Sequence, residues 1–132
     1  MKRVYVVDDE QSIVESVSMV LESGGYEVGF QNDDKDIVEN VLAFGADLVI
    51  LDVMFPEDPG AGFEMARALN ADERTAKIPR IMLTAVNESG IFVGKFSRKD
   101  IDDAWIPVQD FVEKPVKPDA LLEKVKRLCP ND

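Results

Sequence analysis

The sequence predicts an α/β protein with a doubly wound, five-stranded parallel sheet that carries helices on both faces. Short apolar runs alternate along the chain with segments whose apolar residues recur every three or four positions, as strands and amphipathic helices do. The run DLVILD at residues 47–52 is apolar without alternation, which is typical of a central strand covered on both faces. The chain has 132 residues with no internal repeat or linker, so we expect one domain over residues 1–132.

Five segments have the character of short buried strands. They lie at residues 2–7, 27–30, 47–52, 80–84 and 110–113. Helical periodicity marks residues 11–22, which end at Gly24 and Gly25, and residues 63–70.

Two further helices are expected. One of them carries an apolar stripe of Ile37, Val38, Val41 and Leu42, and Asp33 or Asp34 is expected to cap its start. The last helix begins at Pro118, because proline suits the first helical position. Its core stripe consists of Leu121, Leu122, Val125 and Leu128.

Composition excludes several functions. The formal net charge is −11, so a nucleic-acid backbone should repel the chain, and we expect no direct nucleic-acid binding. The absence of histidine excludes histidine acid–base catalysis, histidine metal ligands and a phosphohistidine within the chain. The apolar run at residues 4–7 is too short for a signal peptide or a membrane span, so we expect no membrane insertion and a cytoplasmic location. A single cysteine, Cys129, fits a reducing compartment.

Polar side chains follow four of the expected strands at their carboxyl ends. They are Asp8, Asp9, Asp52, Thr84 and Lys114. In a doubly wound sheet the ligand site lies at this edge, so we expect these residues to meet there. Alone, an aspartate pair is often a helix cap and a single aspartate a turn former. The convergence of all five favours a functional site.

This set of side chains suits phosphoryl transfer to a carboxylate. Three crowded carboxylates repel one another unless a cation neutralises them, and oxygen ligands alone favour Mg²⁺, with Mn²⁺ as a possible substitute. A carboxylate can attack phosphorus to form an aspartyl phosphate. Lys114 supplies positive charge, and the hydroxyl of Thr84 can donate to a phosphoryl oxygen. We therefore expect phosphoryl transfer to one of these carboxylates, with formation of an aspartyl phosphate.

Two other classes of protein compete with this interpretation. A Mg²⁺-dependent phosphatase also uses an aspartyl nucleophile, but it needs a second acidic group, where this chain has Met54, and a substrate-enclosing cap. Turnover of a small phosphate ester would favour that class. A nucleotide- or flavin-binding protein places a phosphate loop after its first strand, and Asp8, Asp9 and Glu10 would repel a phosphate there without metal.

Five segments together resemble the receiver domain of two-component response regulators over nearly the whole chain. They are VYVVDDE (4–10), DLVILDVMFP (47–56), GFEMARAL (62–69), IPRIMLTA (78–85) and FVEKPVKPDALL (111–122). The resemblance implies a flavodoxin-like fold and a sensor histidine kinase or phosphotransfer protein as the phosphoryl donor. It also implies a phosphorylation switch that acts in phosphorelay or in contact with a downstream protein partner. Such a switch is not an enzyme, beyond self-phosphorylation from small donors and self-dephosphorylation.

The resemblance also implies a role for each matching residue. Asp52 matches the phosphoacceptor, Asp9 the direct metal ligand and Asp8 the ligand that acts through water. The backbone carbonyl of Met54 completes the protein's share of the metal shell. Lys114 pairs with the acceptor and its phosphate, and its bond to Pro115 is cis in the family. Thr84 and Phe111 match the switch pair, in which the threonine moves toward the phosphate as the ring turns inward.

The chain departs from the family's pattern in two places. The loop after Asp52 and the interval between Thr84 and Lys114 are both longer than usual, and the second insertion falls within residues 86–109, where the family has its signalling helix. An alternative function is therefore a receiver-like scaffold that acts without phosphorylation through residues 86–109. The sequence ends at Asp132, soon after the last helix, so we expect protein contacts or phosphorelay as the output, unless this is an excised domain.

Overall fold

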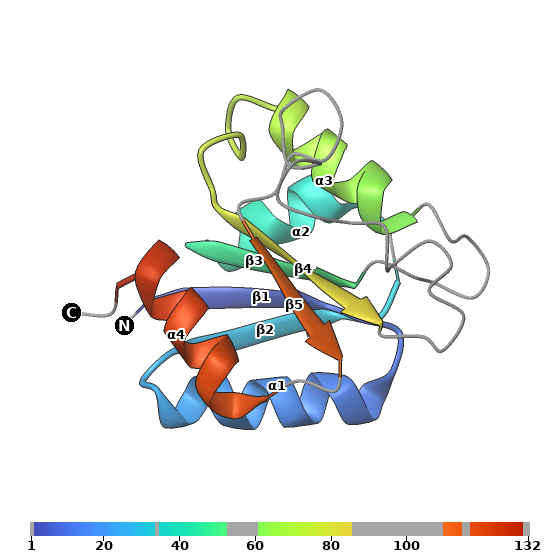
Figure 1. Ribbon diagram of the computed structural model, residues 1–132. Helices are drawn as coiled ribbons and strands as arrows, with labels where there is room; N and C mark the ends of the chain where they lie inside the picture. Colours follow the sequence, from blue (N-terminus) through green and yellow to red (C-terminus); the bar gives the residue numbers. More distant parts are fainter. Residues whose placement is uncertain (1, 34, 53–60, 86–109, 115–116, 131–132) are drawn as a thin grey trace.

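Five parallel strands form one sheet at the centre of the molecule (Figure 1). The computed structural model describes residues 2–33, 35–52, 61–85, 110–114 and 117–130, and for residues 52, 61–63, 84–85 and 110–114 the description covers the backbone. The strands are β1 (Arg3–Val7), β2 (Glu27–Gln31), β3 (Leu48–Asp52), β4 (Arg80–Ala85) and β5 (Asp110–Lys114). Their order in the sheet is β2-β1-β3-β4-β5, which confirms the doubly wound prediction.

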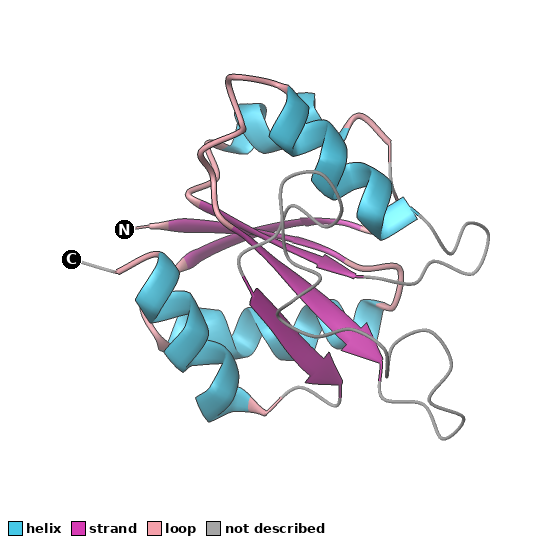
Figure 2. Cartoon of the chain, turned by 45° about the horizontal axis from the view of Figure 1, so that its top comes forward, coloured by secondary structure: helices cyan, strands magenta, loops and turns pink. Residues whose placement is uncertain are grey.

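The chain starts near the centre of the sheet and builds it outward in both directions. From β1 it crosses to β2 at one edge, returns past β1 to β3, and then adds β4 and β5. All four pairings are parallel, so the strand arrows point to the same side of the molecule (Figure 2). The carboxyl ends of all five strands therefore share one edge, which is where the predicted site residues belong.

Within the described residues, two pairs of helices cover the sheet. Helices α1 (Gln11–Ser23) and α4 (Pro118–Leu128) lie on one face, and α2 (Ile37–Phe44) and α3 (Ala61–Ala71) lie on the other (Figure 1). Alternate residues of each strand point to opposite faces of the sheet. Val6, Ile50 and Leu83 pack toward α1 and α4. Val7 and Leu51 pack toward α2 and α3. Because both faces of the sheet are covered by helices, the sequences of the central strands are continuous apolar runs.

Helix α2 begins later than expected, and the predicted cap is wrong. Its N-cap is Asp36, which has a left-handed φ of 52° and makes no side-chain capping bond. Asp33 forms a turn instead, because its Oδ1 accepts a hydrogen bond from the backbone N–H of Lys35 at 3.0 Å. Asp34 lies outside the described residues. The buried stripe of α2 includes Ile37 and Val41, as predicted, and Phe44 packs beside them.

Close approach of α2 to β2 depends on a glycine. A side chain at Gly29 would bring its Cβ within 2.8 Å of the Phe44 ring. The ring also lies 5.6 Å from the ring of Tyr5, centroid to centroid, and the guanidinium of Arg3 lies 5.9 Å from its centroid. Glycine in this strand is thus explained by helix–sheet packing.

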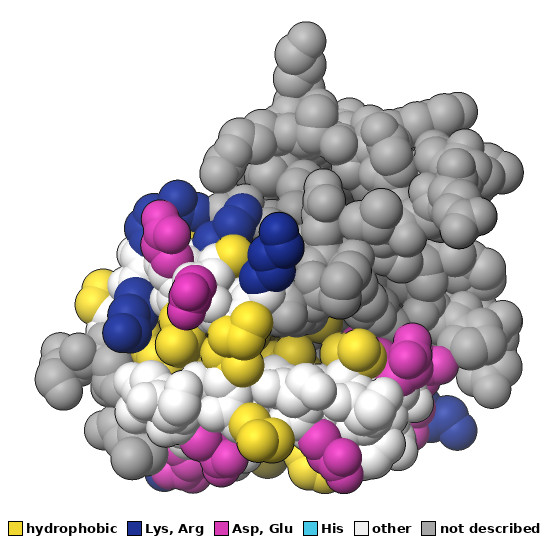
Figure 3. Space-filling model, turned by 60° about the horizontal axis from the view of Figure 1, so that its bottom comes forward, with side chains coloured by type: hydrophobic (Ala, Val, Ile, Leu, Met, Phe, Trp, Pro, Cys, Tyr) yellow, Lys and Arg dark blue, Asp and Glu magenta, His cyan; other side chains and the backbone are white. Residues whose placement is uncertain are grey.

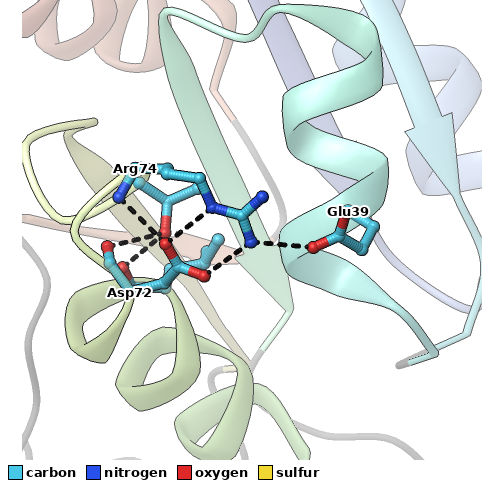
Figure 4. Close-up of polar contacts among 5 residues, drawn as sticks. Glu39, Asp72 and Arg74 are labelled. Carbon is cyan, nitrogen blue, oxygen red and sulfur yellow. Dashed lines mark hydrogen bonds and ion pairs between the residues drawn. The ribbon is translucent and has the colours of Figure 1, made fainter.

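An exposed ion network joins α2 to the turn after α3 (Figure 4). Nη2 of Arg74 lies 2.9 Å from Oε2 of Glu39 and 2.9 Å from Oδ2 of Asp72. Nε of Arg74 donates to Oδ1 of Asp72 at 3.1 Å, and the backbone N–H of Arg74 donates to the same oxygen at 2.9 Å. These hydrogen bonds, helped by the positive charge of Arg74, lower the pKa of Asp72 below its ordinary value of 3.8.

This network predicts a pH-dependent difference between the wild type and the Arg74→Ala variant. The carboxylate of Asp72 has a depressed pKa in the folded state, so its stabilising contribution is present above pH 3.8 and is lost as the pH falls through the folded pKa. We expect the variant to be slightly less stable at neutral pH and to approach the wild type in acid. Urea unfolding across this pH range measures the difference, with Lys77→Ala as a control; a gap unchanged in acid would contradict the prediction.

None of the helices in the described ranges combines the length and the apolar character that crossing a membrane requires.

Candidate functional site

Two aspartates leave β1 at the carboxyl edge of the sheet. Asp8 follows Val7 directly, and its side chain is fully buried, whereas Asp9 is partly buried. Oδ1 of Asp8 accepts a hydrogen bond from the backbone N–H of Glu10 at 3.0 Å, which makes a tight turn into α1. Asp8 therefore has a local role in turning the chain. Burial of a carboxylate is costly, and a turn alone does not require it, which favours an additional role at this edge.

Asp52 ends the central strand. The backbone of β3 pairs Leu51 with Val7 on one side and Asp52 with Leu83 on the other. The residues that follow Val7 and Leu51 thus leave adjacent strands at the same level of the sheet. The backbone position of Asp52 therefore lies beside the turn that holds Asp8.

The other predicted residues lie on β4 and β5. Thr84 is opposite Glu113, and Lys114 is opposite Ala85, so both come at the carboxyl ends of their strands. Phe111 lies further back along β5, opposite Met82. The backbone therefore brings Asp8, Asp52, Thr84 and Lys114 to one edge and leaves Phe111 deeper in the sheet.

Three predictions fall outside the described residues. They concern the backbone carbonyl of Met54, the bond between Lys114 and Pro115, and the conformation of residues 86–109.

Gln31 is a neighbour of this edge that the sequence did not single out. Its backbone oxygen accepts a hydrogen bond from the N–H of Asp8 at 3.2 Å. Its Oε1 accepts from Tyr5 Oη at 2.9 Å and from Asn40 Nδ2 at 3.0 Å, and its Nε2 donates to the backbone oxygen of Lys35 at 3.0 Å. The residue thereby ties the loop after β2 to the strand that carries Asp8. A glutamine at a strand end gives no signal of such a role in the sequence.

Burial and nearby negative charge also affect Tyr5 in this network. Burial raises the pKa of the Tyr5 hydroxyl, and the carboxylate of Asp33 raises it further. The phenol therefore stays protonated and continues to donate its hydrogen bond to Gln31 across the physiological range.

The side-chain atoms of Asp8 and Asp9 that are available to bind a metal at this edge are oxygens. The chain has no histidine, and its one cysteine, Cys129, is buried beyond the end of α4 with its thiol pKa raised by burial. Among the side chains that the structure describes, no three carboxylates or thiols gather as a metal cluster; the side chain of Asp52 is not among those described. Asp8 and Asp9 provide two hard carboxylates in succession, which suits Mg²⁺ better than a soft metal.

Comparison with known proteins agrees with this arrangement. The family model for the response regulator receiver domain matches residues 4–126. The chain belongs to the receiver domain family of two-component response regulators. Its fold is therefore the flavodoxin-like receiver fold, as the resemblance implied. Receiver domains are in general phosphoacceptor switches that interact with histidine kinases or phosphotransfer proteins.

Several relatives are longer than this receiver domain. This chain is 33% identical over 125 residues to the phosphate regulon transcriptional regulatory protein PhoB of Pseudomonas aeruginosa. The match covers 95% of this chain and 50% of PhoB. The chain is 32% identical over 133 residues to the DNA-binding response regulator MtrA of Mycobacterium tuberculosis, covering 99% of this chain and 52% of MtrA. The chain thus spans about half the length of these curated relatives.

Solved structures share the fold over nearly the full length of the receiver domain. The chemotaxis protein CheY4 of Vibrio cholerae matches with a TM-score of 0.75 and 29% identity, covering 97% of this chain and 98% of CheY4. The receiver domain of the sensor histidine kinase PA1611 of Pseudomonas aeruginosa matches with a TM-score of 0.76 and 22% identity, covering 96% of both chains. The PA1611 structure contains a magnesium ion coordinated in its active-site cleft.

Proposed function

We propose that this receiver domain is a phosphorylation-dependent switch whose phosphoacceptor is Asp52. The observation that carries the proposal is the position of Asp52 at the end of the central strand. Its neighbours are the strand that leads into Asp8 and Asp9 and the strand that contains Thr84. A sensor histidine kinase or a phosphotransfer protein is the proposed donor, because the chain contains no histidine of its own.

Asp8, Asp9, Asp52 and the backbone carbonyl of Met54 are the proposed ligands of Mg²⁺. The buried carboxylate of Asp8 and its partly buried neighbour Asp9 support this assignment, because adjacent carboxylates at one edge favour a hard cation. When bound, Mg²⁺ supplies positive charge that offsets the carboxylates and the phosphoryl oxygens. Mn²⁺ accepts the same ligands and is the substitute we expect to work in vitro.

The transfer itself is a displacement at phosphorus. A carboxylate oxygen of Asp52 forms a bond to phosphorus as the bond between phosphorus and the donor nitrogen of phosphohistidine breaks, and the imidazole keeps that electron pair. Lys114 is the proposed cation that pairs with the phosphoryl group, and Thr84 donates its hydroxyl hydrogen to a phosphoryl oxygen. These residues orient the group and balance its charge without transferring a proton to it.

The output of the switch is a change in protein contacts. Thr84 and Phe111 are the proposed switch pair, which couples the phosphoryl group to the surface that meets a downstream protein partner. PhoB and MtrA are named as transcriptional and DNA-binding regulators, and the match covers about half of each. For this acidic domain, with a charge of −11, we propose no direct contact with nucleic acid and a place in the cytoplasm.

Incubation with acetyl phosphate tests the proposal. The intact mass of the protein should rise by one phosphoryl group in the presence of Mg²⁺ and should not rise with chelator. The Asp52→Asn variant should gain nothing, whereas the matched control Asp119→Asn, which changes an exposed residue of α4, should behave as the wild type. No gain in the wild type would contradict the proposal and favour the phosphate-independent scaffold acting through residues 86–109.

A further inference from the structure

An open groove runs between α1 and the edge strand β2, away from the site at the strand ends. Its volume is about 420 Å³, enough for several side chains. The residues that line it are Gln11, Val14, Glu15, Ser18, Met19, Glu22, Val28 and Phe30. All but the last two lie on one flank of α1, and the opposite flank, with Ile13 and Val20, belongs to the core cluster that includes α4 residues.

The groove has an apolar surface that the fold leaves uncovered. Met19 is 70% exposed and Phe30 is 51% exposed, and these are the two large hydrophobic side chains that the described residues leave exposed. The strand alternates its faces, so Val28 and Phe30 point to the α1 side while Gly29 meets Phe44 of α2 on the other. Since β2 is the edge strand of the sheet that the described residues form, none of their other strands helps α1 to cover Phe30.

The rim of the groove is acidic. Glu15 and Glu22 lie two helical turns apart along its α1 wall, and neither the segment of α1 nor that of β2 contains a lysine or an arginine. Figure 3 shows acidic and apolar side chains interspersed along the lower edge of the described surface, while most of the Lys and Arg side chains in that view lie at the left, above that edge. The rim therefore repels anionic lipids and nucleic acid and attracts cations.

We propose that this groove is the docking site for a basic peptide segment of a partner protein. An apolar side chain of the peptide enters beside Met19 and Phe30, and its flanking lysines or arginines pair with Glu15 and Glu22. Charge complementarity selects this occupant, because a second copy of a chain with net charge −11 would bring like charge to the rim. The inference is independent of the phosphoacceptor role of Asp52.

The test uses a defined probe and the full chain. A capped helical peptide of leucine and lysine, with leucine at helical spacing, is titrated into ¹⁵N-labelled protein, and amide shifts are mapped. We expect the largest shifts on α1 and β2, at the residues that line the groove. A peptide with glutamate in place of each lysine should cause none. The Asp52→Asn variant should bind the lysine peptide as the wild type does. The outcome of this test is therefore independent of whether Asp52 accepts a phosphoryl group.

Matched variants distinguish docking from general attraction to an acidic protein. The double reversal Glu15→Lys/Glu22→Lys should weaken binding about tenfold, and Met19→Ala/Phe30→Ala should also weaken it. The control Glu73→Lys/Glu123→Lys changes net charge equally at exposed sites elsewhere and should bind more tightly than the rim variant. Equal losses in both reversals, or shifts centred away from α1 and β2, would overturn the proposal. So would self-association of the free protein that Met19→Ala/Phe30→Ala abolishes, because a second copy would then be the occupant.

Discussion

Mg²⁺ is expected to raise the free energy of unfolding of the wild type by about 2–3 kcal/mol at a hundredfold excess over its dissociation constant. In Asp8→Asn and in Asp9→Asn most of this gain should disappear. The physical reason is that a cation bound only by the folded state stabilises it, and each variant removes one carboxylate from the turn after β1. Without the cation, the variants should be at least as stable as the wild type, because fewer like charges meet at the edge.

The structure makes Asp8→Asn a conservative change. The amide oxygen of asparagine can still accept the hydrogen bond that Oδ1 of Asp8 takes from the N–H of Glu10, so the turn into α1 should persist. Urea unfolding with and without Mg²⁺, at constant ionic strength, measures the gain, and the exposed Glu73→Gln serves as the charge-matched control. If Mg²⁺ stabilises both aspartate variants as strongly as the wild type, the ion is held elsewhere.

Replacing Arg80 with alanine is expected to lower the free energy of unfolding by about 3 kcal/mol or more. The side chain of Arg80 is 1% exposed at the start of β4, although arginine is among the residues least often buried. Its Nη1 donates to the backbone oxygen of Ile78 at 2.9 Å, with longer contacts to the oxygens of Thr75 and Ala76, and its Nη2 donates to Oδ1 of Asn70 at 3.2 Å. Alanine would remove the hydrogen bonds that the guanidinium donates and would leave a cavity in their place.

A second substitution separates the two causes of this loss. Arg80→Met keeps much of the side-chain volume but provides no hydrogen-bond donor. Its free energy of unfolding should therefore exceed that of Arg80→Ala only by the part of the loss that the cavity causes. Chemical denaturation followed by circular dichroism measures both variants, and the exposed Lys77→Ala, in the same turn, should stay close to the wild type. A loss below about 1 kcal/mol in Arg80→Ala would show that the buried guanidinium is dispensable.

Arg80 also connects the stability of the folded protein with the candidate phosphorylation site. It begins the strand that ends with Thr84 and Ala85, and its hydrogen bonds organise the turn that leads from α3 into β4. We therefore expect Arg80→Ala to reduce the yield of phosphoryl transfer at temperatures where the wild type remains folded, through loss of folded protein and without change in the chemistry of Asp52.

Local pattern was sufficient to predict the elements and the edge of the sheet at which the backbone positions of Asp52, Thr84 and Lys114 lie. The uninterrupted apolar run at residues 47–52 indicated a strand covered on both faces, and the periodicity of residues 11–22 indicated a helix; both signals come from neighbouring residues. Capping was less predictable, because Asp33, Asp34 and Asp36 are equally good caps by residue type. Only the path of the chain from β2 decides that Asp36 takes that position.

The sequence by itself determined that strands alternate with helices and that Asp8, Asp9, Asp52, Thr84 and Lys114 follow strands, because side-chain period and turn chemistry are local properties. The tertiary structure decided which strands are neighbours. The order β2-β1-β3-β4-β5 sets Asp52 between the ends of β1 and β4, buries Arg80, brings Gln31 to Asp8 and leaves Phe30 exposed at an edge. Those outcomes depend on contacts between residues distant in the chain, which no local pattern encodes.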